Sequence, residues 1–262
     1  MRRFFASHFY SIRYNIRMQK EIKIFSVPAA IIVGAIIISV AIFFGLRSSS
    51  LSSGGQVAQG QVQGQAQAAA PTVDPSKINT VNEPFIGNPN APVTIAYWYD
   101  YQCPFCKQDE EQTEGNVIPQ IITNYVNAGK VKLIFKDFPF LGADSETLAI
   151  AARAVWDVAP SQFYNWHKAI FDAQGQEGSG WASQSEIMSV TTAVLGAADA
   201  AKVSSLMASN TTTYQNEIAA DKTEGNSFGV NATPSMIIGK QLVIGAEPYA
   251  SIQTAIETAL NP

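Results

Sequence analysis

The only two cysteines of this 262-residue chain stand three positions apart, in the tetrapeptide Cys103-Pro104-Phe105-Cys106. The residues before them, 92–99, are mostly β-branched and aromatic, which predicts a strand that leads directly into Cys103. Pro104 suits the first turn of a helix, where its missing N–H leaves no hydrogen bond unmade. We therefore expect Cys103 to begin a helix and Cys106 to follow one turn later on the same face. The two sulfur atoms could then close a small, exchangeable disulfide.

The next residues predict a second strand in parallel with the first. The helical pattern that starts at Pro104 breaks at 114–116, where Asn116 can cap a further helical segment that ends at Gly129. Residues 131–135 then read as a strand. This order of strand, helix and strand favours parallel pairing, with the cysteines at the carboxyl end of the first strand.

A helical stretch separates these strands from the rest of the sheet. We expect one helix capped by Asp144 or Ser145, another capped by Ser161, a third that opens on the capping box 183–186, and one or two more over 199–224. Strands at 235–238 and 241–244 follow, joined by a Gly-Lys turn, and a last helix covers about 249–260.

Together these features resemble the thioredoxin superfamily, and within it the DsbA-like thiol:disulfide oxidoreductases. The resemblance rests on four segments, 87–93 (GNPNAPV), 100–107 (DYQCPFCK), 136–140 (KDFPF) and 229–235 (GVNATPS). It implies an α/β thioredoxin-like fold over 80–262, with an inserted helical subdomain at about 142–226. It also implies that Pro234 follows a cis peptide bond and packs beside the disulfide, and that the backbone of Thr233 pairs with an extended substrate peptide. Pro104 and Phe105 are expected to contact the substrate as well.

The position of each cysteine predicts its role. A thiolate at the start of a helix meets free N–H groups and the positive end of the helix dipole, so Cys103 should have a lowered pKa and be the attacking or leaving sulfur. Cys106 should be more buried and act as the resolving thiol.

The residue that would handle the proton of Cys106 is not evident. Thioredoxin-like proteins usually carry a buried acid on the first strand, six residues before the attacking cysteine, and here that position is Tyr97. The nearby candidates are Asp100, Glu110 and Glu111.

The N-terminal part predicts a membrane anchor. Residues 24–46 carry no charge, and at ~1.5 Å per residue a helix of this length spans a ~30 Å hydrocarbon core. Residues 1–23 form a basic leader, which by the positive-inside rule is cytoplasmic, so everything from Arg47 onward is expected to be extracytoplasmic, at the inner or plasma membrane. A cleaved signal peptide is the alternative, but its apolar region would be shorter and would end at a small-residue cleavage site.

Composition narrows the function of the remaining part. Residues 47–79 are rich in Ser, Gly, Gln and Ala and predict a flexible linker. Beyond Arg47 there are ten basic and twenty acidic residues, a net charge of −10, which argues against nucleic acid as a ligand.

Two other uses of a cysteine pair with this spacing are a metal site and a structural disulfide. A zinc site needs four ligands, and the only histidines are His8 and His167, so we expect no metal. A purely structural disulfide would close so short a loop that it would stabilise little. His167 lies on the apolar face of its predicted helix and is expected to be a packed residue without chemistry.

We therefore expect an anchored, monomeric enzyme that donates the Cys103–Cys106 disulfide to reduced exported proteins and needs no other cofactor. The resemblance implies reoxidation by a membrane quinone-linked protein of the DsbB or vitamin K epoxide reductase type. The alternatives are a disulfide reductase or isomerase, and a non-catalytic, membrane-tethered folding or binding module.

Overall fold

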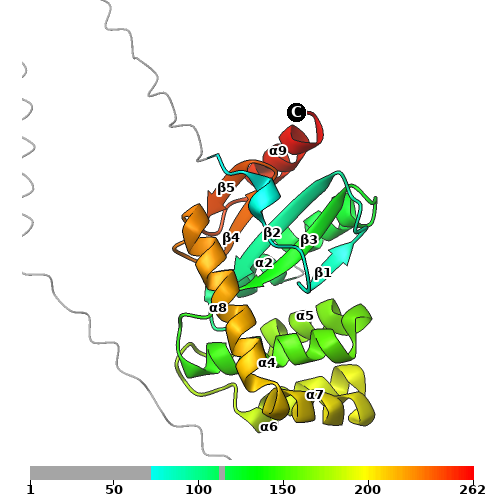
Figure 1. Cartoon of the computed structure of the whole chain (residues 1–262), viewed down its shortest axis with the longest axis vertical. Coiled ribbons are helices and arrows are strands. Elements are labelled where there is room, and N and C mark those ends of the chain that lie inside the picture. Colours follow the sequence, from blue (N-terminus) through cyan, green and yellow to red (C-terminus); the bar gives the residue numbers. More distant parts are fainter. Residues whose placement is uncertain (1–71, 112–115) are drawn as a thin grey trace, which may run out of the picture. The chain divides into compact units, whose positions relative to one another are not determined.

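The computed structural model describes residues 72–111 and 116–262, and these build a five-stranded mixed sheet with helices on its faces and at one end (Figure 1). The strand order is β1-β3-β2-β4-β5. The central pair, β2 and β3, is parallel, and the other three pairs are antiparallel. The strands are β1 (Phe85–Gly87), β2 (Val93–Tyr99), β3 (Val131–Asp137), β4 (Ser235–Ile238) and β5 (Gln241–Ile244).

Four of these strands were predicted and one was not. The strand predicted at 131–135 extends to Asp137, because Lys136 and Asp137 continue the pairing with Trp98 and Tyr99 of β2. β1 has three residues, too few for a visible alternation of apolar and polar side chains. It is identified only by its antiparallel pairing with the outer side of β3.

The connection between β2 and β3 carries the cysteines, as the strand, helix and strand pattern predicts. It contains α2 (Pro104–Glu110), α3 (Val117–Ile121) and a π-helical turn (Ile122–Val126). Asn116 stands at the start of α3, and Gly129 has a positive φ of 70° after the π-helical turn. Two separate helices, α2 and α3, are thus confirmed, whereas residues 114 and 115 of the predicted break lie outside the described residues. Parallel pairing of the flanking strands is confirmed as well.

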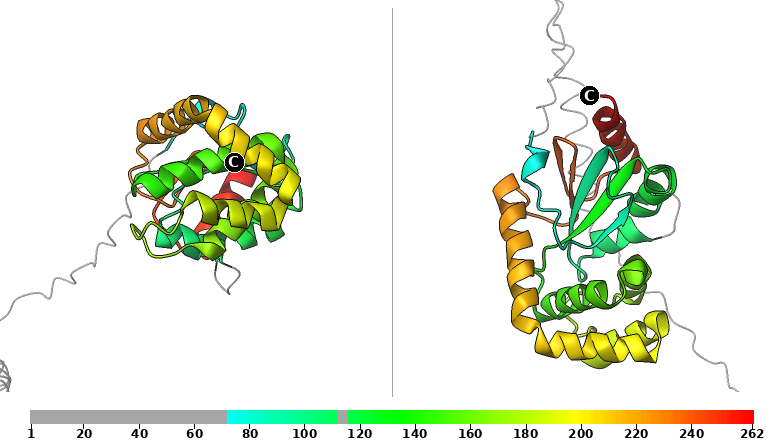
Figure 2. Two further views of the ribbon diagram at one scale, coloured as in Figure 1. Left: turned by 90° about the horizontal axis from the view of Figure 1, so that it is seen from below. Right: turned by 45° about the vertical axis from the view of Figure 1, so that its right-hand side comes forward.

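The helical insertion lies between β3 and β4. Figure 1 and the right-hand view of Figure 2 show α4 to α7 gathered beyond one end of the sheet, with α8 running along the side of both. The C-terminal helix, α9 (Tyr249–Leu260), ends on the opposite side of the sheet from this group. The inserted helices are α4 (Ala143–Val158), α5 (Phe163–Ala173), α6 (Gln184–Leu195), α7 (Ala197–Ser209) and α8 (Thr211–Phe228).

Two predicted helix starts are wrong. α4 begins at Ala143 after Gly142, whose φ of 112° suits glycine, so Asp144 and Ser145 lie inside the first turn and do not cap it. α5 begins at Phe163, because the residues around Ser161 form a 3₁₀ turn over Pro160–Gln162. The capping box that opens α6 is confirmed by reciprocal hydrogen bonds between Ser183 and Glu186.

The two faces of β2 enter different cores, as expected from the period of two along a strand. Tyr97 and Tyr99 point into the larger core, which also includes both cysteines and the aromatic residues of α5. Ala96 and Trp98 point into a smaller core that contains Phe138. The site therefore rests on a strand that is buried on both sides.

A buried ion network ties the insertion to the sheet. Arg153 of α4 forms ion pairs with three carboxylates, those of Glu83, Asp137 and Asp221, which come from the segment before β1, from β3 and from α8. Lys136 of β3 pairs with Glu83 at 2.9 Å and Asp221 at 3.0 Å. Lys136 also pairs with Glu224 at 2.8 Å. Burial raises the pKa values of Asp137 and Asp221 despite these cations.

The start of the described region packs against the end of the sheet. Thr72 bridges to Gln241, the N–H of Val73 donates to the carbonyl of Lys240 at 2.8 Å, and Ile78 is buried. Residues 72–79, assigned to the linker from sequence, thus contact the domain. The predicted leader and anchor, 1–23 and 24–46, lie outside the described residues. Among the helices that are described, none has the length and apolar character to cross a membrane.

Candidate active site

The loop after β2 is shaped by the carboxylate of Asp100. This side chain is buried and accepts hydrogen bonds from the backbone N–H groups of Gln102 at 2.8 Å, Phe140 at 2.9 Å and Leu141 at 3.1 Å. The carbonyl of Asp100 accepts from the N–H of Cys103 at 3.0 Å. Asp100 therefore holds the loop that delivers Cys103 to the start of α2.

Cys103 occupies the N-cap position of α2 and Cys106 lies one turn later, as predicted. Both are free thiols in this structure. Cys103 is 4% exposed and Cys106 is fully buried. Of the two, only Cys103 retains access to a partner molecule.

The environments of the two sulfur atoms separate their pKa values in the predicted directions. A hydrogen bond from the Cys106 thiol lowers the pKa of Cys103 to about 6, although burial acts in the opposite direction. The Thr233 side chain and the N–H groups of Cys106 and Phe105 lower this pKa further. Burial raises the pKa of Cys106 well above its ordinary value. At neutral pH the pair therefore contains one thiolate, on Cys103, and one thiol.

The loop that precedes β4 approaches Cys103 from the neighbouring strand. β4 pairs with β2, with Ser235 opposite Trp98. The Thr233–Pro234 peptide bond is cis, as the resemblance implies. The Sγ atom of Cys103 lies 3.4 Å from the carbonyl oxygen of Thr233. The buried hydroxyl of Thr233 has no hydrogen-bond partner among the described residues, so it is available to donate to a thiolate.

Three exposed hydrophobic side chains, here called the apolar rim, stand on segments that border the site. Phe105 is 56% exposed, Phe140 is 49% exposed and Ile244 is 40% exposed, and these are three of the four large hydrophobic side chains exposed among the described residues. Phe105 follows Cys103 by two positions, Phe140 binds Asp100 through its N–H, and Ile244 pairs with Ser235 next to Pro234. Pro104 is exposed as well, whereas Thr233 and Pro234 are buried.

The acids near the pair have distinct environments. The carboxylate of Glu110 accepts a hydrogen bond from the hydroxyl of Tyr164 at 3.1 Å and lies 3.1 Å from Nε2 of His167. His167 is fully buried among aromatic rings, and its Nδ1 lies 2.8 Å from the hydroxyl of Tyr101. The prediction that His167 is a packed residue is confirmed.

Asp109 is a buried acid that sequence reasoning missed. It is 4% exposed and lies on α2, three residues after Cys106. The spacing of i and i+3 from Cys106 was visible in the sequence, but the exposed or buried state of the carboxyl was not. The burial of this carboxyl depends on the loop at 246–248, which lies more than a hundred residues after Asp109 in the sequence and lines a cavity together with it.

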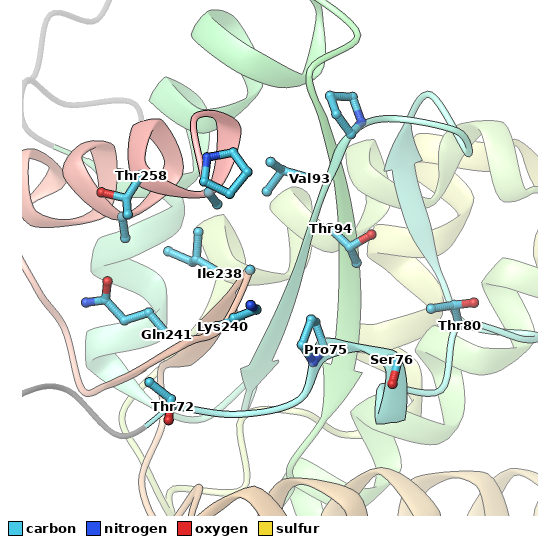
Figure 3. A pocket seen from close by; sticks show the side chains of 15 residues that line it. Thr72, Pro75, Ser76, Thr80, Val93, Thr94, Ile238, Lys240, Gln241 and Thr258 are labelled. Carbon is cyan, nitrogen blue, oxygen red and sulfur yellow. The ribbon is translucent and has the colours of Figure 1, made fainter.

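A pocket of about 1030 Å³ lies at the other end of the sheet. Figure 3 shows Val93 and Thr94, at the start of β2, facing it together with Ile238 and Lys240 from the β4–β5 hairpin. Among the described residues that line it, Lys240 alone has an ionisable side chain. It contains none of the site residues predicted from sequence.

Comparisons with known proteins agree with this geometry. The model of a family described as Thioredoxin matches residues 79–258. The chain is 26% identical over 186 residues to "Disulfide bond formation protein D" of Bacillus subtilis, covering 68% of this chain and 78% of that protein.

Solved structures show the same fold. The crystal structure of oxidised BdbD from Bacillus subtilis superposes with a TM-score of 0.65 at 22% identity, covering 74% of this chain and 99% of that one. The thiol-disulfide exchange protein alpha-DsbA2 from Wolbachia pipientis gives a TM-score of 0.59 at 24% identity, covering 70% of this chain and 90% of that one.

Proposed function

Since this chain belongs to the thioredoxin family and is a thiol:disulfide oxidoreductase, we propose that it donates the Cys103–Cys106 disulfide to exported proteins during oxidative folding. The observation that carries this proposal is the inequality of the two sulfur atoms. Cys103 has a pKa of about 6 and lies 3.4 Å from the Thr233 carbonyl, whereas Cys106 is fully buried. The relatives that are named for disulfide bond formation support it.

The proposed reaction proceeds through one mixed disulfide. A substrate thiolate attacks Sγ of Cys103, the bond between Cys103 and Cys106 breaks, and the electron pair leaves on Cys106. The substrate's second thiolate then attacks the sulfur of the first, and Cys103 leaves as a thiolate. The substrate loses two electrons and gains a disulfide, and the enzyme is left as a dithiol.

The apolar rim supports an unfolded protein as the substrate. Phe105, Phe140 and Ile244 offer hydrophobic contacts to side chains that a folded protein would bury. We propose that an extended segment of the substrate binds next to these side chains, against Pro104 and the Thr233–Pro234 loop. This mode uses backbone pairing for affinity and tolerates many sequences, as oxidation of different clients requires.

Each turnover needs a partner that reoxidises the pair. We propose a membrane quinone-linked protein of the DsbB or vitamin K epoxide reductase type, reached by a domain that is anchored through residues 24–46 and lies outside the cytoplasm. We further propose that the domain acts as a monomer, because an isomerase of this superfamily generally needs a dimerisation module that places two sites around one cleft.

The direction of the reaction is a matter of redox potential. Thioredoxin, a reductant, has a potential of about −270 mV, and its attacking cysteine has a pKa of about 7. A pKa of about 6 for Cys103 makes the disulfide more oxidising by at most about 30 mV. A larger difference in redox potential from thioredoxin must come from the relative stability of the neutral dithiol and the disulfide forms, which the pKa of Cys103 does not report.

Equilibration of the full chain with glutathione tests the proposed direction. We expect a potential well above about −270 mV and nearer to about −120 mV, the value of a strong oxidant. A potential at or below that of thioredoxin would rule out donation of disulfides as the main role and would favour the reductase alternative.

A further inference from the structure

Asp109 is a buried carboxyl with no partner. It is 4% exposed, and it makes no hydrogen bond or ion pair with any other residue that the structure describes. The carboxylate oxygens are not among the fully enclosed polar atoms without a partner, so they reach the cavity that Asp109 lines, where water can hydrate them.

The position of Asp109 connects the buried thiol to the surface. Because Asp109 follows Cys106 by three residues on α2, the two side chains leave the helix on the same face, with Cβ atoms about 5–6 Å apart. Asp109 also lines a cavity of about 280 Å³ between the end of α2, the start of α3 and the loop at 246–248. A cavity of this size and polarity has room for several water molecules.

The other groups near Cys106 are unsuited to accept its proton. Burial raises the pKa of Tyr97 well above its ordinary value, and the negative charges of Cys106, Asp109 and Glu110 raise it further. Asp100 is engaged by three backbone N–H groups, and Glu110 by His167 and Tyr164. Among the described carboxylic acids beside the pair, Asp109 alone is buried and free of a hydrogen bond or ion pair, and the hydroxyl of Tyr97, which also lacks a partner, is too weak an acid to serve.

We propose that Asp109 exchanges the proton of Cys106 during thiol–disulfide exchange, through the cavity between α2, α3 and the 246–248 loop. This inference rests on the proposed function of the cysteine pair. Thioredoxin-like proteins usually carry a proton-accepting acid where this chain has Tyr97, and we assign that task to Asp109.

The proton moves in opposite directions in the two half-reactions. When a substrate thiolate attacks Cys103, the S–S bond breaks, the electron pair leaves on Cys106, and neutral Asp109 donates a proton to it. When the enzyme is reoxidised, the thiolate of Cys103 first forms a mixed disulfide with the oxidant. Asp109 then removes the proton of Cys106, Cys106 attacks Sγ of Cys103, and the oxidant leaves as a thiolate.

The acidity of Asp109 suits both directions. Burial raises its pKa to about 8, with contributions from the negative charges of Glu110 and Cys103. A group with a pKa near the working pH is the most effective proton carrier. Besides Glu110 and Cys103 on α2, the groups of the described residues that face this region are Tyr97 from β2 and Glu247 across the cavity, and α3 offers no ionisable side chain.

The test follows the two steps of reoxidation separately. Reduced full-length protein is mixed with glutathione disulfide, quenched with acid at intervals, and analysed by mass spectrometry for the mixed disulfide at Cys103 and for the closed Cys103–Cys106 disulfide. We expect Asp109→Asn to leave the first step unchanged and to slow the second at pH 7 by at least about 100-fold. In the native protein the second rate should level off above about pH 8, whereas in the variant it should keep rising with pH, because hydroxide replaces the carboxylate.

Three further variants make the outcome decisive. Glu177→Gln removes an exposed acid and should change neither step, and Glu111→Gln removes the rival acid at the end of α2 and should also change neither. Asp109→Glu retains a base and should keep a rate that levels off with pH, which preserves the test if Asp109→Asn does not fold. An unaltered second step in Asp109→Asn, or a loss in Glu111→Gln, would overturn the assignment of Asp109 and leave the proposed function intact. Failure of the native protein to form the closed Cys103–Cys106 disulfide would instead overturn the proposed function.

Discussion

Cys103 and Cys106 are one helical turn apart, yet the surrounding residues push their acidities in opposite directions. The cause is local for Cys103, which has hydrogen-bond donors at the start of α2, and global for Cys106, which lies beneath the helix in the larger core. The helix start was predictable from Pro104 and the preceding strand. The contribution of Thr233 was not, because it comes from a residue 130 positions away.

The pKa difference predicts selective alkylation. Reduced protein treated with limiting iodoacetamide should be labelled at Cys103, with a rate that rises through about pH 6 and then levels off. Peptide mapping by mass spectrometry measures both sites at once. The Cys106→Ser variant should still be labelled at Cys103, with a profile displaced toward higher pH if the serine hydroxyl replaces the thiol incompletely as a hydrogen-bond donor. Preferential labelling of Cys106 in the native protein would reverse the assignment of roles.

The same shift predicts how the stability of the reduced form depends on pH. The folded pKa of Cys103, about 6, lies below the value of about 8.5 for an unfolded cysteine, so the thiolate stabilises the fold. This contribution is fully present above about pH 8.5 and is lost as the pH falls through about 6. Urea unfolding of the reduced protein and of reduced Cys103→Ser should therefore show a difference that shrinks toward acid pH.

Among the secondary-structure elements, α4 and α8 depend most on each other and on the sheet through Arg153. This guanidinium contacts carboxylates from three other segments, and Lys136 shares two of them. The helices themselves were predictable from apolar periodicity and from the capping box of α6. Their ion network was not, because it joins Glu83 to Asp221, which are 138 positions apart in the sequence, and no local pattern predicts such a contact.

Removal of the guanidinium should be strongly destabilising. Arg153→Met keeps most of the apolar stem but leaves buried carboxylates without their cation, which should cost about 3–5 kcal/mol of unfolding free energy at pH 7. The cost should fall at pH 5, because the carboxylates can take up protons instead.

Urea unfolding followed by circular dichroism measures this cost. Lys168→Met is the matched control, because it breaks the exposed pair with Asp172 on α5, and it should cost at most about 1 kcal/mol. Equal effects of the two substitutions would contradict the structural role given to the network.

For the whole molecule, the sheet and its crossover could be read from the sequence because β2, β4, β5 and α9 have strong and uninterrupted local patterns. The three-residue β1, the contacts of residues 72–79 and the burial of Asp109 could not. Each of these depends on a surface supplied by a distant part of the chain.

The anchor predicted at 24–46 sets the expected placement of the domain. Protease added to spheroplasts or protoplasts should digest the chain beyond about Arg47 and leave the basic leader protected. Antibodies against a tag at each end report the two products after electrophoresis. A soluble mature form that begins near residue 48 or 70 would show that the apolar segment is removed as a signal peptide.

The position of the insertion between the two halves of the site also sets the timing of its assembly during synthesis. Cys103 leaves the ribosome 130 residues before Thr233, the residue whose carbonyl it contacts. At about 5–20 residues per second this interval is on the order of 10 s. During that time β4 is not yet present to pair with β2, and Cys103 lacks the contribution of Thr233 to its lowered pKa. The complete site, with Thr233 beside Cys103, therefore exists only after the segment that contains β4 has been made.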